Sequence, residues 1–471
     1  MIRFSLDDTI AAIATSLGES GIGIVRISGR EALKIADRIF FSKSGKKPSK
    51  FKTYTLHYGW VVEDTRKIKP HIDRPDEFID EALLTVMLAP YSYTREDVVE
   101  INCHGGIVAL RKTLELALNY GARLAEPGEF TCRAYLNGRI DLVQAEAVLR
   151  IVHAKTESAL KLGTTSLAGV ISREFLYLRE EILDLLVLLE ANIDFPEEEI
   201  EPLSIKEIEQ KLNRLIEQIG KLIDSYRYGR IFSEGIKVVI CGKPNVGKSS
   251  LLNALLKEER AIVTPIAGTT RDTLEEIIDI RGIPVKLVDT AGIIEPRDLV
   301  EREAVKRSKK CIEEADLVIL VFDGSTELNE DDLFLIKKLK DRNVLAVINK
   351  VDLKQTIDKQ TIKNYFKKIV DISVKKHKNI ELLEEQIESF VYNGKVNIPP
   401  LRFAINLRQR DLLNKVRFYL KEAKESLKRG FSIEFISQDL KESMAYLDEL
   451  TGKSFNEQLL NRIFSEFCIG K

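Results

Sequence analysis

The segment "CGKPNVGKSS" limits most strongly what this chain can fold into. It fits the pattern G-x-x-x-x-G-K-[ST], follows the apolar run "IKVVI" and opens the helical pattern "SSLLNALL". A strand, a glycine-rich turn and a helix in this order form a P-loop, whose backbone N–H groups surround phosphate oxygens at a helix N-terminus. The sequence therefore predicts an α/β domain that binds a nucleotide.

The residues of this loop have separate expected functions. Lys248 brings a positive charge to the β- and γ-phosphates, and the hydroxyl of Ser249 is a ligand for Mg²⁺. The predicted nucleotide-binding residues of the segment are Gly242, Asn245, Val246, Gly247, Lys248, Ser249 and Ser250.

Two further segments predict that the base is guanine. "NKVD" ends an apolar strand, and Asp352 can accept two hydrogen bonds from the N1–H and 2-amino groups of guanine, which adenine cannot offer. Asn349 and Lys350 are expected to orient that loop. "SVK", with Ser373 and Lys375, is expected to complete the base pocket.

The segments between these motifs should face the phosphates. Asp289 in "DTAG" can hold the Mg²⁺ shell, and the Gly292 amide can sense the γ-phosphate. Thr270 in "TPIAGTTRD" can reach Mg²⁺ only when the γ-phosphate is present, so this segment is the expected switch. Thr264 and Thr269 of the same segment are also predicted to contact the nucleotide.

Catalysis must use residues other than those of Ras-like proteins. Ile293 stands where they have the glutamine that orients water. Glu301 is our candidate for positioning the water through a relay, although the helix dipole alone would also stabilise a glutamate at a helix start. Asn245 and the carbonyls of Thr264 to Thr269 are oxygen ligands without a carboxylate, which suit a large monovalent cation. The sequence therefore predicts activation by K⁺.

The rest of the chain should form further domains, because 471 residues exceed what one hydrophobic core supports. Residues 1–120 mix short β-branched runs with one helical stretch and predict a small α+β domain. Helical spacing of apolar residues follows over 121–230 and returns over 391–471. Since neither helical flank alone would bury its apolar stripe, we expect the Ras-like GTPase domain, residues 231–390, to be inserted between two halves of one helical domain.

Charge and composition exclude several classes of protein. Lys and Arg (72) nearly balance Asp and Glu (73), so any contact with RNA must be local. The basic stretch "KSGKKPSKFK", residues 43–52, indicates a solvated loop, with RNA contact as the alternative. No apolar run approaches the about 20 residues of a membrane span, and no signal peptide is indicated, so we expect a cytoplasmic protein without a membrane partner. The five scattered cysteines should be free thiols.

With these residues identified, the whole chain resembles the MnmE (TrmE) family of tRNA uridine-modifying GTPases. The resemblance rests on "DTIAAIAT", "GIGIVRISG", "YSYTREDVVEINCHGG", "EPGEFTCRAYLNGRIDLVQAEAV", the P-loop, "TPIAGTTRD", "DTAG", "NKVD" and the terminal "CIGK". It implies an N-terminal domain that forms a homodimer and binds a tetrahydrofolate, 5-formyl or 5,10-methylene. It also implies that the protein works with the flavoprotein MnmG to modify C5 of the wobble uridine of certain tRNAs, with the folate as one-carbon donor.

The resemblance also implies roles for individual residues. It places K⁺ at Asn245, Thr264, Ile266 and Thr269, Mg²⁺ at Ser249 and Thr270, and the catalytic glutamate at Glu301. It places the folate at Arg26, Glu100, Arg139 and Lys471. A carboxylate such as Glu100 can bind the 2-amino and N3–H groups of a pterin, and the cations can meet its carbonyl and glutamate-tail oxygens.

The terminal "FCIGK" has an expected function in this context. It follows a helical pattern in which Ser454 and Glu457 fit a capping box and Gly470 lies past the end. We expect this helix to bring Cys468 and Lys471 to the folate pocket, with Cys468 as nucleophile or proton donor. A thiol without a chemical role is the alternative.

Two other functions are compatible with a GTPase domain alone. One is a ribosome-assembly switch that transfers no carbon. The other is a dimeric scaffold that couples the GTP state to the docking of a partner.

Overall fold

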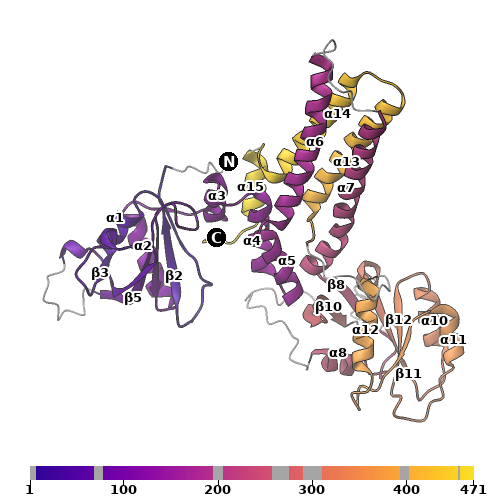
Figure 1. Ribbon diagram of the computed structural model, residues 1–471. Coiled ribbons are helices and arrows are strands. Elements are labelled where there is room, and N and C mark those ends of the chain that lie inside the picture. The colour runs from indigo at the N-terminus through magenta and orange to yellow at the C-terminus, as the bar shows by residue number, and fades with distance from the viewer. Residues whose placement is uncertain are drawn as a thin grey trace. The chain divides into compact units, whose positions relative to one another are not determined.

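The structure is a computed structural model, and it describes residues 7–67, 78–194, 205–256, 275–289, 310–392, 403–454 and 457–471. The chain separates into two units, drawn in Figure 1. Unit 1 is Met1–Leu149, Ser172–Val187 and Leu440–Lys471, and unit 2 is Arg150–Ile171 and Leu188–Asp439. Within the described ranges, no helix combines the length and apolar character needed to cross a membrane.

Unit 1 is built on a sheet whose described strands run in the order β3-β4-β5-β6-β2-β1-β7. The strands are β1 (Ile10–Ile13), β2 (Gly23–Ser28), β3 (Phe40–Ser42), β4 (Thr55–Val62), β5 (Phe78–Met87), β6 (Val98–Cys103) and β7 (Arg123–Leu124). Alternate strand residues such as Val25, Ile27 and Ile101 share one core with α1 (Ala32–Ile39) and α2 (Ile107–Asn119). These helices therefore cover one face, as Figure 1 shows. The expected α+β fold is confirmed.

Short elements complete the rim of this domain. Two 3₁₀ turns, η1 (Pro48–Lys50) and η2 (Thr65–Lys67), contact α1. After β7 come α3 (Glu129–Leu136) and α4 (Leu142–His153). The C-terminal α15 (Glu457–Ser465) packs against α3, where Gly128 has φ +69° and an added Cβ would lie 2.6 Å from the Phe464 carbonyl oxygen. Only glycine fits at this close approach.

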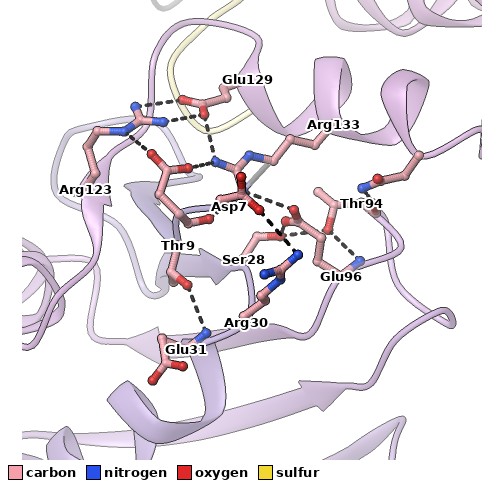
Figure 2. Close-up of polar contacts among 12 residues, drawn as sticks. Asp7, Thr9, Ser28, Arg30, Glu31, Thr94, Glu96, Arg123, Glu129 and Arg133 are labelled. Carbon is pink, nitrogen blue, oxygen red and sulfur yellow. Dashed lines mark hydrogen bonds and ion pairs between the residues drawn. The ribbon is translucent and has the colours of Figure 1, made fainter. Parts of the chain in front are cut away.

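A network of buried and partly exposed charges joins the start of the chain to α3 (Figure 2). Arg133 has no exposed side-chain surface, and its guanidinium donates to Asp8, Glu96 and Glu129 at 2.5 to 3.0 Å. Arg123 donates to Asp8 at 2.8 Å and to Glu129 at 2.6 Å. Although burial opposes ionisation of Asp8, hydrogen bonds from both arginines hold its pKa below the usual value. The network fixes α3, and the C-terminal segment packed on it, against the sheet.

Unit 2 holds a second sheet, whose described strands run in the order β13-β12-β11-β8-β10-β9. They are β8 (Ile236–Cys241), β9 (Glu275–Ile280), β10 (Ile283–Asp289), β11 (Leu317–Asp323), β12 (Val344–Asn349) and β13 (Ile369–Asp371). All pairs are parallel except β9 with β10. Helices α8 (Lys248–Leu256) and α12 (Ile380–Val391) share a core with one face, and α10 (Glu330–Leu339) and α11 (Lys359–Tyr365) with the other. Coverage of both faces explains the continuous apolar runs of the strands.

The helices beside this sheet show that the α/β domain is inserted. Helix α7 (Ile205–Glu234) leads into β8, and α13 (Leu407–Lys428) follows α12 in the sequence, yet α7 and α13 pack along each other. Helix α5 (Glu157–Leu167) also contacts α7, while α6 (Val170–Asp194) and α14 (Ile433–Thr451) contribute residues to both units. The expected insertion into a helical domain is confirmed, and the residue bounds of the four predicted ranges stay predictions.

Candidate functional site

The P-loop connects β8 to α8 and has a backbone that requires glycine at two places. Gly242 has φ +150°, and an added Cβ would lie 2.4 Å from the Val321 carbonyl oxygen. Gly247 has φ +100°, and an added Cβ would lie 2.4 Å from Nδ2 of Asn349. The loop is therefore pressed against the neighbouring strand ends, which leaves its opposite side for a ligand.

A pocket of about 750 Å³ opens beside this loop at the carboxyl ends of the parallel strands. Open α/β sheets bind ligands at this edge. The pocket is lined by the predicted residues Asn245, Gly247, Lys248, Ser249, Ser250, Asn349, Lys350, Asp352 and Lys375, together with Leu353 and Val374. Of the other predicted residues nearby, Val246 and Ser373 are buried. Residues from three distant segments thus meet in one pocket.

The carboxylate of Asp352, which is predicted to recognise the guanine base, accepts a hydrogen bond from a neighbouring hydroxyl. Ser373 Oγ donates to Asp352 Oδ1 at 2.5 Å and accepts from the Lys376 backbone N–H at 3.2 Å. The hydrogen bond from Ser373 holds the pKa of Asp352 below its usual value. Asp352 is therefore an ionised acceptor whose orientation is fixed by Ser373.

Asn349 and Lys350 connect the "NKVD" loop, residues 349–352, to the P-loop. Asn349 Nδ2 donates to the Val246 carbonyl at 2.9 Å, and Lys350 Nζ donates to the Asn245 carbonyl at 2.9 Å. Lys350 Nζ also pairs with Asp323 at 2.5 Å. Burial opposes ionisation of Asp323, but hydrogen bonds led by that from Lys350 lower its pKa overall. Both side chains thus connect their loop to the P-loop, and their predicted roles in nucleotide binding stay predictions.

Asp323 is a site residue that the sequence analysis missed. It is the last residue of β11, in "LVILVFD", and a polar side chain at the carboxyl end of a buried strand was the available signal.

The two lysines of the P-loop have different partners. Lys248 Nζ donates to the Lys243 carbonyl at 2.9 Å, so its ammonium lies over the loop. Lys243 Nζ pairs at 2.8 Å with Asp332, whose side chain is almost fully buried in the capping box that starts α10. Lys243 therefore anchors the loop, whereas Lys248 lines the pocket.

Several predicted residues fall outside the described part of the chain. They are Thr264, Ile266, Thr269, Thr270, Gly292 and Glu301, and the side chain of Asp289 is also not described. Their roles in the switch, the cation sites and catalysis stay predictions.

A second group of predicted residues meets on the sheet of unit 1. Arg26 of β2 and Glu100 of β6 are partners in the strand register, and Arg26 Nε donates to Glu100 Oε1 at 2.7 Å. Both side chains are about one-fifth exposed (18% and 20%). The guanidinium of Arg139 lies 4.8 Å from the ring centre of Tyr93, and that of Arg26 lies 5.9 Å from the same ring. Tyr93, which the sequence analysis missed, thus joins two of the predicted residues.

The end of the chain reaches the same group. Arg26 Nη1 donates to the Gly470 carbonyl at 3.0 Å. Gly470 has φ +94°, and an added Cβ would lie 2.5 Å from the Ile13 carbonyl oxygen of β1. Lys471 is half-buried next to it. The terminal residues are therefore packed on the sheet at a defined place.

All five cysteines are free thiols, as predicted. Cys103, Cys132 and Cys241 are buried, and burial raises their pKa values to about 11, 12 and 12. Cys468 is exposed and lies in the turn after α15, where its carbonyl accepts from the Gly128 backbone N–H at 3.5 Å. The side chain of Glu457 is not described, so the predicted capping box with Ser454 is untested.

The fold and the pocket together define a class of protein. A P-loop on a mainly parallel sheet, with an "NKVD" loop beside it that presents an ionised aspartate, is the nucleotide site of a P-loop GTPase.

Comparisons with known proteins identify the family. The family described as "MnmE helical domain" matches residues 142–468, and "GTP-binding protein TrmE N-terminus" matches residues 9–139. The tRNA modification GTPase MnmE of Thermoanaerobacter pseudethanolicus is 47% identical over 98% of this chain and 99% of its own length. The tRNA modification GTPase MnmE of Clostridioides difficile is 46% identical over 99% of this chain and 100% of its own length. The chain belongs to the MnmE family of tRNA modification GTPases, and it is therefore a GTP hydrolase.

Among solved structures, a single-residue variant of Era from Aquifex aeolicus, bound to GDP and AlF₄⁻, is 29% identical to this chain. The match covers 39% of this chain and 66% of the Era chain. The TM-score of this match is 0.28.

Proposed function

We propose that this GTPase is activated by K⁺ and, together with the flavoprotein MnmG, adds an aminomethyl-type group to C5 of the wobble uridine of certain tRNAs. A tetrahydrofolate, 5-formyl or 5,10-methylene, supplies the carbon. The observation that supports this most is that Arg26 contacts Glu100, Tyr93 and the Gly470 carbonyl, while Arg139 lies over the same Tyr93 ring. A GTPase switch without carbon transfer would not need such a group.

The chemistry of this group fits a folate. Glu100 offers carboxylate oxygens to the 2-amino and N3–H groups of the pterin, and Arg26 holds that carboxylate in place. Arg139 and Lys471 supply cations for carbonyl and carboxylate oxygens. When bound, the folate would supply a one-carbon unit at the oxidation level of its formyl or methylene group. Cys468 is the exposed thiol of the adjacent turn, and we assign it the role of nucleophile or proton donor.

Replacing Gly470 by alanine tests this site. The new methyl group would lie 2.5 Å from the Ile13 carbonyl oxygen at a φ that alanine rarely adopts, so the terminal residues must move away from Arg26. We expect affinity for 5-formyl-tetrahydrofolate, measured by titration calorimetry, to fall about tenfold or more. Ile469→Ala is the matched control, because that side chain is exposed. Equal affinity of Gly470→Ala and wild type would refute the placement, and a wild-type protein that binds no folate would refute the proposed donor.

Within the GTPase domain, we assign K⁺ to Asn245 with the carbonyls of Thr264, Ile266 and Thr269, and Mg²⁺ to Ser249 and Thr270. Glu301 is the proposed catalytic glutamate. The support from the structure is that Asn245 and Ser249 both line the nucleotide pocket. An amide oxygen suits K⁺ and a hydroxyl suits Mg²⁺.

The K⁺ assignment predicts the behaviour of Asn245→Gly. Asn245 has φ +63°, so glycine removes the side-chain oxygen without strain and keeps the carbonyl that accepts from Lys350. We expect GTP affinity to be retained while the difference between hydrolysis rates in K⁺ and Na⁺ disappears. Rates in the two salts at equal ionic strength check this. An unaltered cation preference would rule out Asn245 as a ligand.

Exposed apolar side chains on two neighbouring strands of the N-terminal sheet support a homodimer. Leu56 (58% exposed), Tyr58 (38%) and Leu83 (37%) lie on β4 and β5, where Tyr58 and Leu83 are partners in the strand register. Exposed apolar side chains that are grouped on one sheet face are typical of a contact surface. We propose that two copies of the chain meet through this domain, in the cytoplasm, where MnmG and tRNA are the further partners.

A further inference from the structure

A second pocket, of about 770 Å³, lies in unit 1 beside α1 and β3. Figure 1 shows these two elements at one end of the N-terminal domain. In the strand order β3 is four places from β2, the strand of Arg26. At about 4.8 Å per strand, that is roughly 19 Å across the sheet. None of the residues assigned above to nucleotide or folate lines this pocket.

Basic side chains dominate the lining. Among the described residues that line the pocket, the cations are Lys34, Arg38, Lys46, Lys47 and Arg66, and the acids are Glu31 and Asp37. Both carboxylates already accept hydrogen bonds from neighbouring residues. Asp37 accepts from the Ser49 backbone N–H at 2.8 Å and from its hydroxyl at 2.6 Å, and Glu31 accepts from Lys34 at 2.8 Å.

Three of the cations lack a close carboxylate partner. Arg66 pairs with Asp64 at 2.6 Å, but Arg38 Nη1 stays 3.9 Å from that carboxylate and makes no hydrogen bond. Lys46 and Lys47 are exposed, and no acidic group of the described ranges lies within ion-pair distance of them. The pocket therefore carries an excess of positive charge that an anion would neutralise.

The loop that carries the two lysines is held in place. The Lys43 backbone N–H donates to the Tyr58 carbonyl at 3.1 Å, and Gly45 N–H donates to the Ser42 carbonyl at 2.9 Å. Ser49 and its bonds to Asp37 of α1 fix the other end. A site that is already ordered binds a ligand at a lower entropic cost. Lys50 and Lys52 of the same basic stretch do not line the pocket.

We propose that this basic pocket binds the phosphodiester backbone of the tRNA substrate. The proposal depends on the tRNA modification activity of the family and not on the folate assignment. Since the chain has a net charge of −1, RNA must be attracted by a local concentration of cations such as this one. A folded RNA is large enough to contact the pocket while its anticodon is held elsewhere on the protein.

The test compares Lys46→Gln/Lys47→Gln with Lys50→Gln/Lys52→Gln, a control with the same charge loss in the same stretch. Binding of an unmodified tRNA transcript to the full-length protein is followed by fluorescence anisotropy over a range of KCl. We expect the pocket variant to bind about tenfold or more weakly at about 0.1 M salt, and the slope of log K against log[KCl] to become shallower by about 2. The control should match wild type.

Equal loss in the two variants, no loss in either, or no binding by wild type would each overturn the proposal. If inorganic phosphate bound to wild type and not to the pocket variant while the two proteins bound tRNA equally, the pocket would be a small-anion site and the proposal would also be overturned. The urea unfolding midpoint reported by Trp60 of β4 should be unchanged in both variants, which checks that the N-terminal sheet is folded. Folate binding by wild type is measured separately, so its failure would leave this comparison interpretable.

Discussion

Replacing Asp352 by asparagine is expected to change the base preference of the nucleotide pocket from guanine to xanthine. The ionised carboxylate, held by the 2.5 Å hydrogen bond from Ser373, can accept from both N1–H and the 2-amino group of guanine. An amide has one acceptor oxygen, and its NH₂ group would face the 2-amino donor. Xanthine has a carbonyl at C2, so the amide could accept from N1–H and donate to that carbonyl. We expect GTP affinity to fall at least about 100-fold and xanthosine triphosphate to become the preferred nucleotide.

Competition binding and kcat/KM for GTP, xanthosine triphosphate and ATP measure this change. Asp331→Asn is the matched control, because Asp331 is an exposed residue in the first turn of α10 and its replacement removes the same charge. It should keep the wild-type preference. If Asp352→Asn still preferred GTP, another group would have to recognise the base.

The nucleotide pocket could be predicted from the sequence because each of its parts is short and local. Lys248, Asn349 and Asp352 stand in motifs of a few residues, each at the carboxyl end of an apolar strand, and a parallel sheet brings those ends to one edge. The ion pair between Lys350 and Asp323 could not be predicted, since it joins the ends of two neighbouring strands and no spacing marks it.

The group around Arg26 shows a different limit. Arg26 and Glu100 both lie in segments that resemble the family, but their pairing depends on the register of β2 and β6. Residue spacing does not give that register, because the partners are 74 positions apart. For the same reason the sequence does not predict the pocket beside α1. The sequence shows Lys46 and Lys47 in a basic stretch, whereas Arg38 joins them only through the packing of α1.

The buried network around Arg133 was the least predictable feature, because charged residues are normally expected at the surface. Glu129 and Arg133 are four residues apart on α3, which indicates a pair on one helix face. Their partners Asp8 and Glu96 come from distant segments, and Figure 2 shows Glu96 beside the same guanidinium. Only the tertiary fold brings the three carboxylates to the guanidinium of Arg133.

Replacing Arg133 by methionine is therefore expected to lower the free energy of unfolding of the N-terminal unit by about 3 kcal/mol. Methionine can fill much of the volume but cannot donate to Asp8, Glu96 or Glu129. Glu129 has no exposed side-chain surface, so its charge would lose one of two arginine partners without gaining water. Arg123 would still pair with it at 2.6 Å, which keeps the expected loss at the lower end of the range for broken buried ion pairs.

Urea unfolding followed through tryptophan fluorescence measures this loss locally. Trp60 is the only tryptophan of the chain and lies on β4, so its signal reports this sheet and not the GTPase domain. Arg30→Met is the matched control, because Arg30 meets Asp7 at 3.3 Å with both side chains more than three-quarters exposed, and water replaces such a pair at little cost. We expect its unfolding midpoint to coincide with that of wild type, while the midpoint of Arg133→Met moves to lower urea. If the two variants shifted together, loss of positive charge in general would explain the effect, and the buried network would not be what holds α3 to the sheet.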